Sequence, residues 1–465
     1  MNSKENLKSL WKKFGESKYS YQEHVTISTI DSMEEPARKV VCINDLKKRK
    51  RLYGICGECN VPGTGEYWCQ SCNAGRSKNN FKNWTSGNED IDEFIQQSQL
   101  NAVHHKKYLE WIPFENIKNV TYITRGGFGK VYSANWAKGF ILYWDIEGQK
   151  WERISNVKVA LKSLNNSSHI STDFLDEIKS HLQIYLYDVI QCYGITQNPV
   201  TKDYIMVLEY CEDGNLRNYY LNNETNYYSK IYELRDIASG LLDIHNAGKV
   251  HKNFHSGNIL YGSGGYPNIS DLGMCQPVNN EEQSVKKEGI YGVLPYMAPE
   301  LLRGYHYTKA SDIYSFGIMI NEYISEEIPY NNIPHNHALA IKICKGLRPN
   351  IFKYTPKLLA DLITKCWDAK VENRPTAKEL YQALNKWVSY GYDNIAIYSQ
   401  MNKYDDVTKL NRISEKKSEN IQTHPQAIYT SRLLNFKNLP EPVNSDIIQS
   451  IIFSEDFDLD ESVIL

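Results

Sequence analysis

The chain has 465 residues, of which 41% are hydrophobic and 23% are charged, an ordinary composition for a globular protein with room for a large core and additional modules. Its net charge of −2 provides no global field that would attract nucleic acid or an acidic membrane. We expect no membrane span, because no apolar run reaches the roughly 18–20 residues that a bilayer crossing needs. The polar N-terminus also lacks the apolar core of a signal peptide, so we predict a cytoplasmic or nuclear protein whose ten cysteines are thiols or metal ligands rather than disulfides.

Residues 1–51 show no sustained hydrophobic period, and we expect weak order there. The segment ends in the basic run K-K-R-K-R at 47–51. Such a run is typical of a nuclear-import signal or an anion-binding patch. It also fits a solvated charge cluster that leads into the next module.

Two C-x-x-C pairs, separated by nine residues, lie within residues 52–80. Four thiolates in two knuckles suit tetrahedral Zn²⁺, and a closed shell of four ligands favours a structural role. The spacing resembles that of short four-cysteine zinc ribbons. Two disulfides or a redox C-x-x-C pair are the alternatives, but neither a secretion signal nor a βαβ pattern accompanies the cysteines. The candidate ligands are Cys56, Cys59, Cys69 and Cys72.

Residues 90–111 place apolar side chains at near-helical spacing, with Asp90 as a suitable cap. This pattern predicts a helical linker, and Pro113 marks its end. A small zinc module of this kind can bind protein or RNA, so it is the one segment where we expect nucleic acid could be contacted.

The main domain opens with a Gly-rich hairpin pattern, Y-I-T-R-G-G-F-G-K-V-Y at 122–132. The insertion Gly139–Arg153 carries a turn signal and predicts an extra hairpin. A strand-like run, V-K-V-A-L-K, ends at Lys162, and an amphipathic helix that carries Glu177 follows. Because an unpaired buried charge is costly, we expect Lys162 to pair with Glu177.

Three further motifs follow in order: Y-I-M-V-L-E-Y at 204–210, V-H-K-N-F-H-S-G-N-I-L at 250–260 and I-S-D-L-G at 269–273. Together with the Gly-rich hairpin and Lys162, they resemble the motifs of protein kinases, and the replacement of the usual catalytic-loop lysine by F-H-S-G resembles the tyrosine-kinase-like group. The resemblance extends from Phe114 to about Trp387. It implies an α+β, two-lobed kinase domain at 112–390, with a β-rich N-lobe and a helical C-lobe.

The same resemblance implies sites for ATP and Mg²⁺. Asn258 and Asp271 would hold the metal ion, whose hard oxygen ligands they supply. Lys162 would contact the phosphates, with Glu177 as its partner. The Gly-rich motif departs from the family at Thr124, where the first glycine is expected. The implied ATP-binding residues are Thr124, Gly126, Gly129, Val131, Ala160, Lys162, Glu209, Cys211, Asp213 and Leu260.

Asn253 occupies the position of the family's catalytic aspartate. A carboxamide can accept a hydrogen bond from a substrate hydroxyl, but it cannot take the proton. Loss of a general base typically costs about 10²–10⁴ in rate. This predicts a pseudokinase or a very slow kinase.

Two structural roles and a tail complete the expectations. Glu300 should pair with Arg374, and Asp312 should cap the backbone of the catalytic loop, in a helix whose apolar sequence predicts burial. Residues 391–465 are expected to form a flexible tail with an acidic end, within which 428–434 could serve as a docking peptide.

Three functions remain open. The first is a signalling pseudokinase that binds ATP–Mg²⁺ and acts through protein partners. The second is an active Ser/Thr kinase that tolerates Asn253 and phosphorylates protein substrates. In the third, the zinc module binds protein or RNA, and the kinase fold is its scaffold.

Overall fold

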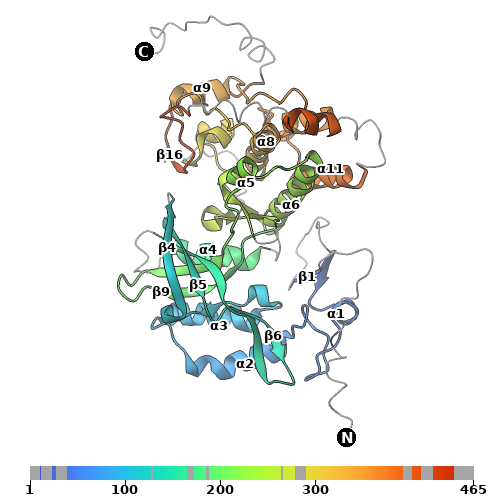
Figure 1. Ribbon diagram of the computed structural model, residues 1–465, viewed down its shortest axis with the longest axis vertical. Helices are drawn as coiled ribbons and strands as arrows, with labels where there is room; N and C mark the ends of the chain where they lie inside the picture. Colours follow the sequence, from blue (N-terminus) through green and yellow to red (C-terminus); the bar gives the residue numbers. More distant parts are fainter. Residues whose placement is uncertain are drawn as a thin grey trace, which may run out of the picture. The chain divides into compact units, whose positions relative to one another are not determined.

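The computed structural model describes residue 11 and the ranges 24–27, 39–126, 129–164, 172–184, 188–262, 265–277, 290–390, 401–409 and 423–444. These residues form two compact units, and Figure 1 labels several of their helices and strands. The first comprises the described residues of Met1–Tyr219, Arg235–His251 and Gly257–Pro277. The second comprises those of Tyr220–Leu234, Lys252–Ser256 and Val278–Leu465.

The first unit combines a six-stranded sheet with short helices and small two-stranded sheets. Its elements outside the six-stranded sheet are β1 (His24–Ile27), β2 (Lys39–Cys42), α1 (Leu46–Tyr53), α2 (Gln70–Asn80), η1 (Phe81–Asn83), α3 (Glu89–Asn101), η2 (His105–Lys107), η3 (Phe114–Asn116), β6 (Phe140–Asp145), β7 (Lys150–Ile154), α4 (Thr172–Gln183), β11 (Lys249–Val250), β12 (Ile259–Tyr261), β13 (Pro267–Ile269), η5 (Leu272–Met274) and β14 (Gln276–Pro277). In the described part of the chain, three helices have residues in both units: α5 (Leu216–Asn222), α6 (Tyr227–Asn246) and η4 (Ser256–Asn258).

The six-stranded sheet is antiparallel except at one edge, where β3 and β9 run parallel. Successive residues of a strand point to opposite faces, and β10 follows this rule. Met206 and Leu208 enter the hydrophobic cluster on one face, whereas Ile205 and Val207 enter the cluster on the other. The strand order is β3 (Glu110–Trp111), β9 (Cys192–Gln197), β10 (Tyr204–Glu209), β8 (Val157–Leu164), β5 (Gly129–Trp136) and β4 (Ile117–Arg125).

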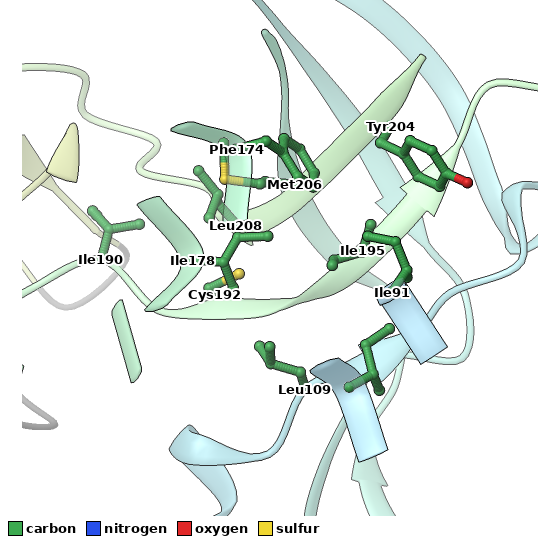
Figure 2. Close-up of a cluster of buried hydrophobic side chains, with 11 residues drawn as sticks. Ile91, Leu109, Phe174, Ile178, Ile190, Cys192, Ile195, Tyr204, Met206 and Leu208 are labelled. Carbon is green, nitrogen blue, oxygen red and sulfur yellow. The ribbon is translucent and has the colours of Figure 1, made fainter. Parts of the chain in front are cut away.

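Helices α3 and α4 both bury side chains in the cluster that contains Met206 and Leu208. Figure 2 shows Ile91 of α3 and Ile178 of α4 in this cluster, together with Ile195 of β9. All three side chains have no exposed surface. The N-terminal helix α3 therefore shares a core with the sheet and with α4.

The insertion after β5 forms the predicted hairpin, since β6 and β7 pair in antiparallel register. The hairpin packs against the cysteine-rich segment. Trp68 stacks on Trp151 with ring centroids 5.8 Å apart, and Tyr67 lies 5.6 Å from Tyr143. Arg76 of α2 lies over the ring of Trp144 at 4.3 Å, a distance suited to a cation–π contact.

The basic run expected to be solvated lies in α1, and one of its members is buried. Arg49 is 6% exposed and donates hydrogen bonds to the carbonyl oxygens of Ile43, Pro62 and Gly63. The guanidinium has five donors in a fixed fork, so it can tie several backbone carbonyls together. Arg49 thus joins α1 to the loop between the cysteine pairs.

The second unit is mainly helical. Helix α8 (Lys309–Ser325) buries every residue from Ser311 to Ile324, as its apolar sequence predicted, and begins with a capping box between Thr308 and Ser311. The remaining elements are β15 (Ile290–Gly292), η6 (Leu294–Tyr296), α7 (Pro299–Leu302), α9 (His337–Cys344), α10 (Lys357–Cys366), η7 (Val371–Asn373), α11 (Ala377–Tyr390), a helical segment at 401–409 and β16 (Arg432–Leu434). The β-rich first unit and the helical second unit confirm the predicted α+β class.

Two parts of the range expected to be a flexible tail are described, and both are packed. In the segment 401–409, the Tyr404 hydroxyl lies 3.0 Å from Nζ of the fully buried Lys230. In the segment 423–444, β16 pairs antiparallel with β15, and Arg303 forms an ion pair with Glu441. Leu434 of β16 is only 4% exposed. Burial of such apolar groups stabilises an otherwise polar segment.

None of the helices in the described part of the chain combines the length and apolarity that a bilayer crossing requires.

Candidate active site

Three charged side chains from three elements meet in the first unit. Lys162 at the end of β8 donates hydrogen bonds to Oε1 of Glu177 on α4 and to Oδ1 of Asp271, each at 2.6 Å. The predicted pair between Lys162 and Glu177 is therefore formed. The side chains of Lys162 and Glu177 are 12% and 2% exposed, so solvent screens this pair only weakly.

The two carboxylates hold Lys162 in its charged form. Burial by itself would lower the pKa of Lys162, but the charges of Asp271 and Glu177 raise that pKa above its usual value. A buried lysine without such partners would lose its proton or destabilise the fold. The ammonium group is thus a fixed positive charge, which is what a phosphate-binding lysine must supply.

Asp271 and Asn258 lie together through the backbone of their two loops. The Ser270 amide and hydroxyl both donate to the carbonyl oxygen of Asn258, at 2.8 and 2.9 Å. Nδ2 of Asn258 lies 3.5 Å from Oδ2 of Asp271. His251, which has no exposed surface, places Nε2 3.0 Å from the carbonyl oxygen of Ser270. The side-chain oxygens of Asn258 and Asp271 are ligands of the kind that Mg²⁺ prefers, so these two residues fit the predicted metal site.

The backbone at Asp271 is in the left-handed region, with φ 60° and ψ 61°. A non-glycine residue rarely adopts this conformation, which costs of order 1–3 kcal/mol and occurs preferentially at functional sites. Here it directs the Asp271 carboxylate to Lys162 while Leu272, the next residue, is fully buried.

The predicted nucleotide-binding residues of the sheet are neighbours in register. Thr124 pairs with Val131 in the β4–β5 hairpin, and Val131 pairs in turn with Lys162 of β8. The amide of Gly126 donates to the carbonyl oxygen of Gly129 at 2.9 Å, beside the tip of the hairpin. The hairpin tip, residues 127 and 128, lies outside the described residues.

The remaining predicted residues follow on the next strand and the loop after it. Ala160 pairs with Leu208 of β10. Cys211 and Leu260 pack against the same hydrophobic cluster as Leu208, and Glu209 ends the strand. The amide of Asp213 donates to the carbonyl oxygen of Tyr261, next to Leu260, at 3.3 Å. Ala160, Cys211 and Leu260 thus pack against one hydrophobic cluster together with Leu208.

Asn253 belongs to the second unit, where its loop is held on α8. The amide of Lys252 donates to Oδ1 of Asp312 at 3.0 Å, as predicted. Phe254 packs edge-to-face on Phe316 with centroids 5.3 Å apart. Asn253 itself is 4% exposed. The loop is therefore fixed on both sides of Asn253.

The predicted buried bridge between Glu300 and Arg374 is present and bidentate. Nη1 and Nη2 of Arg374 donate to the two carboxylate oxygens of Glu300 at 2.7 and 2.8 Å. Arg374 also donates to the carbonyl oxygens of Ala310 and Asp368. Bidentate pairs of this kind are the strong ones, and this pair ties α7 to the segment before α11.

The four cysteines predicted to bind zinc are brought together. Their sulfur atoms all lie within 4.8 Å of one another, with 3.8 Å between Cys56 and Cys72 and 3.6 Å between Cys59 and Cys69. Four sulfurs at about 2.3 Å from a central Zn²⁺ in a tetrahedron would be about 3.8 Å apart. The cluster therefore fits zinc, and its four thiols suit a closed, structural site.

Comparison with known protein families matches residues 117–384 to the family described as "Protein tyrosine and serine/threonine kinase". These residues make up more than half of the chain. The match covers every residue predicted for the nucleotide and magnesium sites, and it excludes the four cysteines.

Curated relatives include both specificities. The chain is 25% identical to the tyrosine-protein kinase SPK-1 of Girardia tigrina over 295 residues, which are 61% of this chain and 56% of the relative. It is 26% identical to the human tyrosine-protein kinase TXK over 296 residues, covering 63% and 52% of the two chains. A probable LIM domain-containing serine/threonine-protein kinase of Dictyostelium discoideum is 31% identical over 192 residues, covering 41% and 29%. The chain thus spans little more than half the length of these relatives at most.

The sequence reasoning missed the contacts of two residues at the site. Gly273 faces Glu177 so closely that a Cβ at position 273 would lie 2.8 Å from Oε2 of Glu177. Lys107 donates to carbonyl oxygens at the end of α4. Gly273 was visible in its motif, but its contact was not. Lys107 lies in a polar run, which gives no sign that its amino group bonds to the end of α4.

Proposed function

Since the chain belongs to the family of protein tyrosine and serine/threonine kinases, we propose that it binds ATP with Mg²⁺ and acts in signal transduction with weak or no phosphoryl transfer. The observation that carries this proposal is the pair of 2.6 Å hydrogen bonds from Lys162 to Glu177 and Asp271. Catalysis in this family needs both the lysine–glutamate pair and the aspartate that holds the metal.

Each group has a distinct role in nucleotide binding. Lys162 supplies the positive charge for the phosphates, and Glu177 holds its amino group in place. Asn258 and Asp271 would hold the Mg²⁺ ion, which when bound neutralises charge on the phosphates. The backbone of Glu209–Cys211 would receive the adenine above Leu260, with Asp213 near the ribose.

Asn253 determines how far the chemistry goes. Its side-chain oxygen can accept a hydrogen bond from a substrate hydroxyl and orient it, but a carboxamide cannot receive the proton. The loss of general-base catalysis corresponds to about 2.7–5.4 kcal/mol of barrier, at about 1.36 kcal/mol per decade. Positioning and electrostatics carry much of phosphoryl transfer, so a slow reaction remains compatible with this site.

Comparing the wild-type chain with Asn253→Asp tests this proposal. The variant should transfer phosphate to a generic protein substrate at least about a hundredfold faster, with the same affinity for ATP–Mg²⁺. Lys162→Met is the control that should abolish transfer in both backgrounds. Equal rates for the wild type and Asn253→Asp would contradict the proposed loss of general-base catalysis at Asn253. Absence of ATP affinity would contradict the nucleotide site.

An active serine/threonine kinase is the second candidate. It is supported by the Dictyostelium relative, which carries a serine/threonine-protein kinase name, and by the held conformation of the loop around Asn253. Phosphorylated serine or threonine formed by the wild-type chain at an ordinary kinase rate would favour it.

The third candidate is a zinc module that binds protein or RNA, with the kinase fold as its scaffold. The sulfur cluster of Cys56, Cys59, Cys69 and Cys72 supports the zinc site. Binding of a partner that survives Lys162→Met and is lost on removal of zinc would favour this function.

A further inference from the structure

The position of α4 decides whether Glu177 reaches Lys162, and a lysine from outside the family match holds the end of this helix. Nζ of Lys107 donates to the carbonyl oxygen of His181 at 3.2 Å and to that of Ile184. Helix α4 ends at Gln183. The last four carbonyls of a helix have no partner within the helix, and a cation there also complements the negative end of the helix dipole.

The same N-terminal segment contacts the surroundings of α4 a second time. Ile91 and Ile95 of α3 are fully buried in one cluster with Phe174 and Ile178 of α4. Figure 2 shows Ile91, Phe174 and Ile178 in this cluster. Phe174 and Ile178 flank Glu177 in the sequence. Helix α3 therefore packs in the same cluster as the apolar side chains of α4 that lie on either side of Glu177 in the sequence.

The residues that follow Lys107 are fixed to α3 and to the β6–β7 hairpin. Nε2 of Gln99 donates to the carbonyl oxygen of Leu109 at 2.8 Å, and the amide of Leu109 donates to Oγ of Ser98 at 3.1 Å. Glu110, in the strand that follows, forms an ion pair with Arg153 of the hairpin. Lys107 is thus the last residue of η2, and the residues that follow it are fixed to α3 and to the hairpin. Because this segment is held in place, Lys107 can in turn hold α4 in place.

Burying the charge of a lysine at position 107 costs desolvation free energy, which an apolar side chain in the same place would not. Burial lowers the pKa of Lys107 to about 7, although the charge of Asp243 opposes this shift. An apolar residue would fill the same space without desolvating a charge. What an apolar residue cannot do is bond the two carbonyl oxygens at the end of α4.

We propose that Lys107 is a positioning residue, which together with α3 holds α4 where Glu177 meets Lys162, so that the segment 89–111 controls the nucleotide site. This inference rests on the proposed function for its consequence in ATP binding. Its structural part, the placement of α4, can be measured without nucleotide.

The test uses the full chain carrying Lys107→Met, with Lys78→Met as the matched control. Lys78 is an exposed lysine of α2. Amide hydrogen exchange without nucleotide should become about tenfold faster within 172–184 in Lys107→Met, the size expected when a charged hydrogen bond is lost. Exchange in the buried strand β10 should stay unchanged, and Lys78→Met should behave as the wild type.

Nucleotide affinity provides the second measurement. Lys107→Met should weaken binding of ATP–Mg²⁺ by about tenfold, and Lys107→Arg, which keeps the charge, should restore part of this loss. Unchanged exchange in 172–184 would overturn the inference. An equal loss of protection in β10 and α4 would also overturn it, because Lys107 would then support folding in general. Faster exchange in α4 of a chain that binds no ATP would leave the placement standing and refute the proposed function.

Discussion

The carboxylate of Glu177 lies against Gly273 at a distance that leaves no room for a side chain. A Cβ at position 273 would be 2.8 Å from Oε2 and 3.1 Å from Cδ of Glu177. Gly273 directly follows Leu272, which is fully buried and cannot move away easily. The bare backbone of Gly273 therefore allows Glu177 to reach Lys162.

Gly273→Ala should weaken ATP–Mg²⁺ binding by about tenfold while changing the melting temperature little. The added methyl group displaces the end of the Glu177 side chain, which can move, and so breaks a charged hydrogen bond to Lys162. Isothermal titration calorimetry measures the affinity.

Gly75→Ala is the control for this substitution. A Cβ at position 75 of α2 meets nothing within 4 Å, and alanine favours a helix over glycine by roughly 0.5–1 kcal/mol. This variant should bind nucleotide as the wild type does. An unaltered affinity in Gly273→Ala would show that Glu177 has room to adapt.

Breaking the bridge between Glu300 and Arg374 should destabilise the chain strongly. The Arg374 side chain has no exposed surface, and Arg374→Ala would leave a carboxylate buried without its partner, at a cost of about 3–5 kcal/mol. Urea denaturation followed by circular dichroism measures the loss.

Lys357→Ala serves as the comparison for this bridge. Lys357 pairs with Asp361 one turn later, but their side chains are 82% and 51% exposed, so solvent and salt screen this pair. We expect no measurable change in stability. If both variants lost the same stability, burial would not explain the strength of the Arg374 bridge.

Leu434→Ala should destabilise the second unit, whereas Leu433→Ala should not. Adjacent residues of a strand point to opposite sides, and in β16 Leu434 is 4% exposed while Leu433 is 54% exposed. Truncation of a buried leucine costs about 2–5 kcal/mol. Hydrogen exchange at Ile290–Gly292, the partner strand, reports whether β16 has detached. Slow exchange there in Leu434→Ala would mean that β15 is held by other contacts.

Purified protein should contain about one zinc ion per chain, and a strong chelator should remove it. Loss of the ion should make residues 52–80 sensitive to protease and change the fluorescence of Trp68, which is fully buried and stacks on Trp151. Atomic absorption, limited proteolysis and fluorescence measure these effects.

The kinase region should keep its cooperative unfolding after chelation, because its sheet and helices do not depend on the thiols. Cys69→Ser should reproduce the effect of chelation, and Cys42→Ser should not, since Cys42 lies outside the sulfur cluster. Unfolding of the whole chain on chelation would place the cysteine module inside the kinase fold.

The sequence by itself determined the parts that depend on local patterns. Spacing identified the four cysteines, a turn signal identified the hairpin at Gly139–Arg153, and a nearly continuous apolar run identified the buried helix α8. The motifs, together with the cost of an unpaired buried charge, paired Lys162 with Glu177. The sequence also showed that the Asn253 side chain cannot act as a general base, because a carboxamide cannot take a proton in any fold. Such inferences need only residue type and short-range geometry.

Only the tertiary structure showed where polar segments dock. The contact of Lys107 with α4 and the strand at Arg432–Leu434 join residues far apart in the chain, and Arg49 is buried by the loop between the cysteine pairs. From the sequence alone a hydrophilic side chain is expected to be exposed. Only the position of its partners in the fold shows that it is buried or bonded. These long-range contacts are set by the packing of the whole chain, which no local pattern encodes.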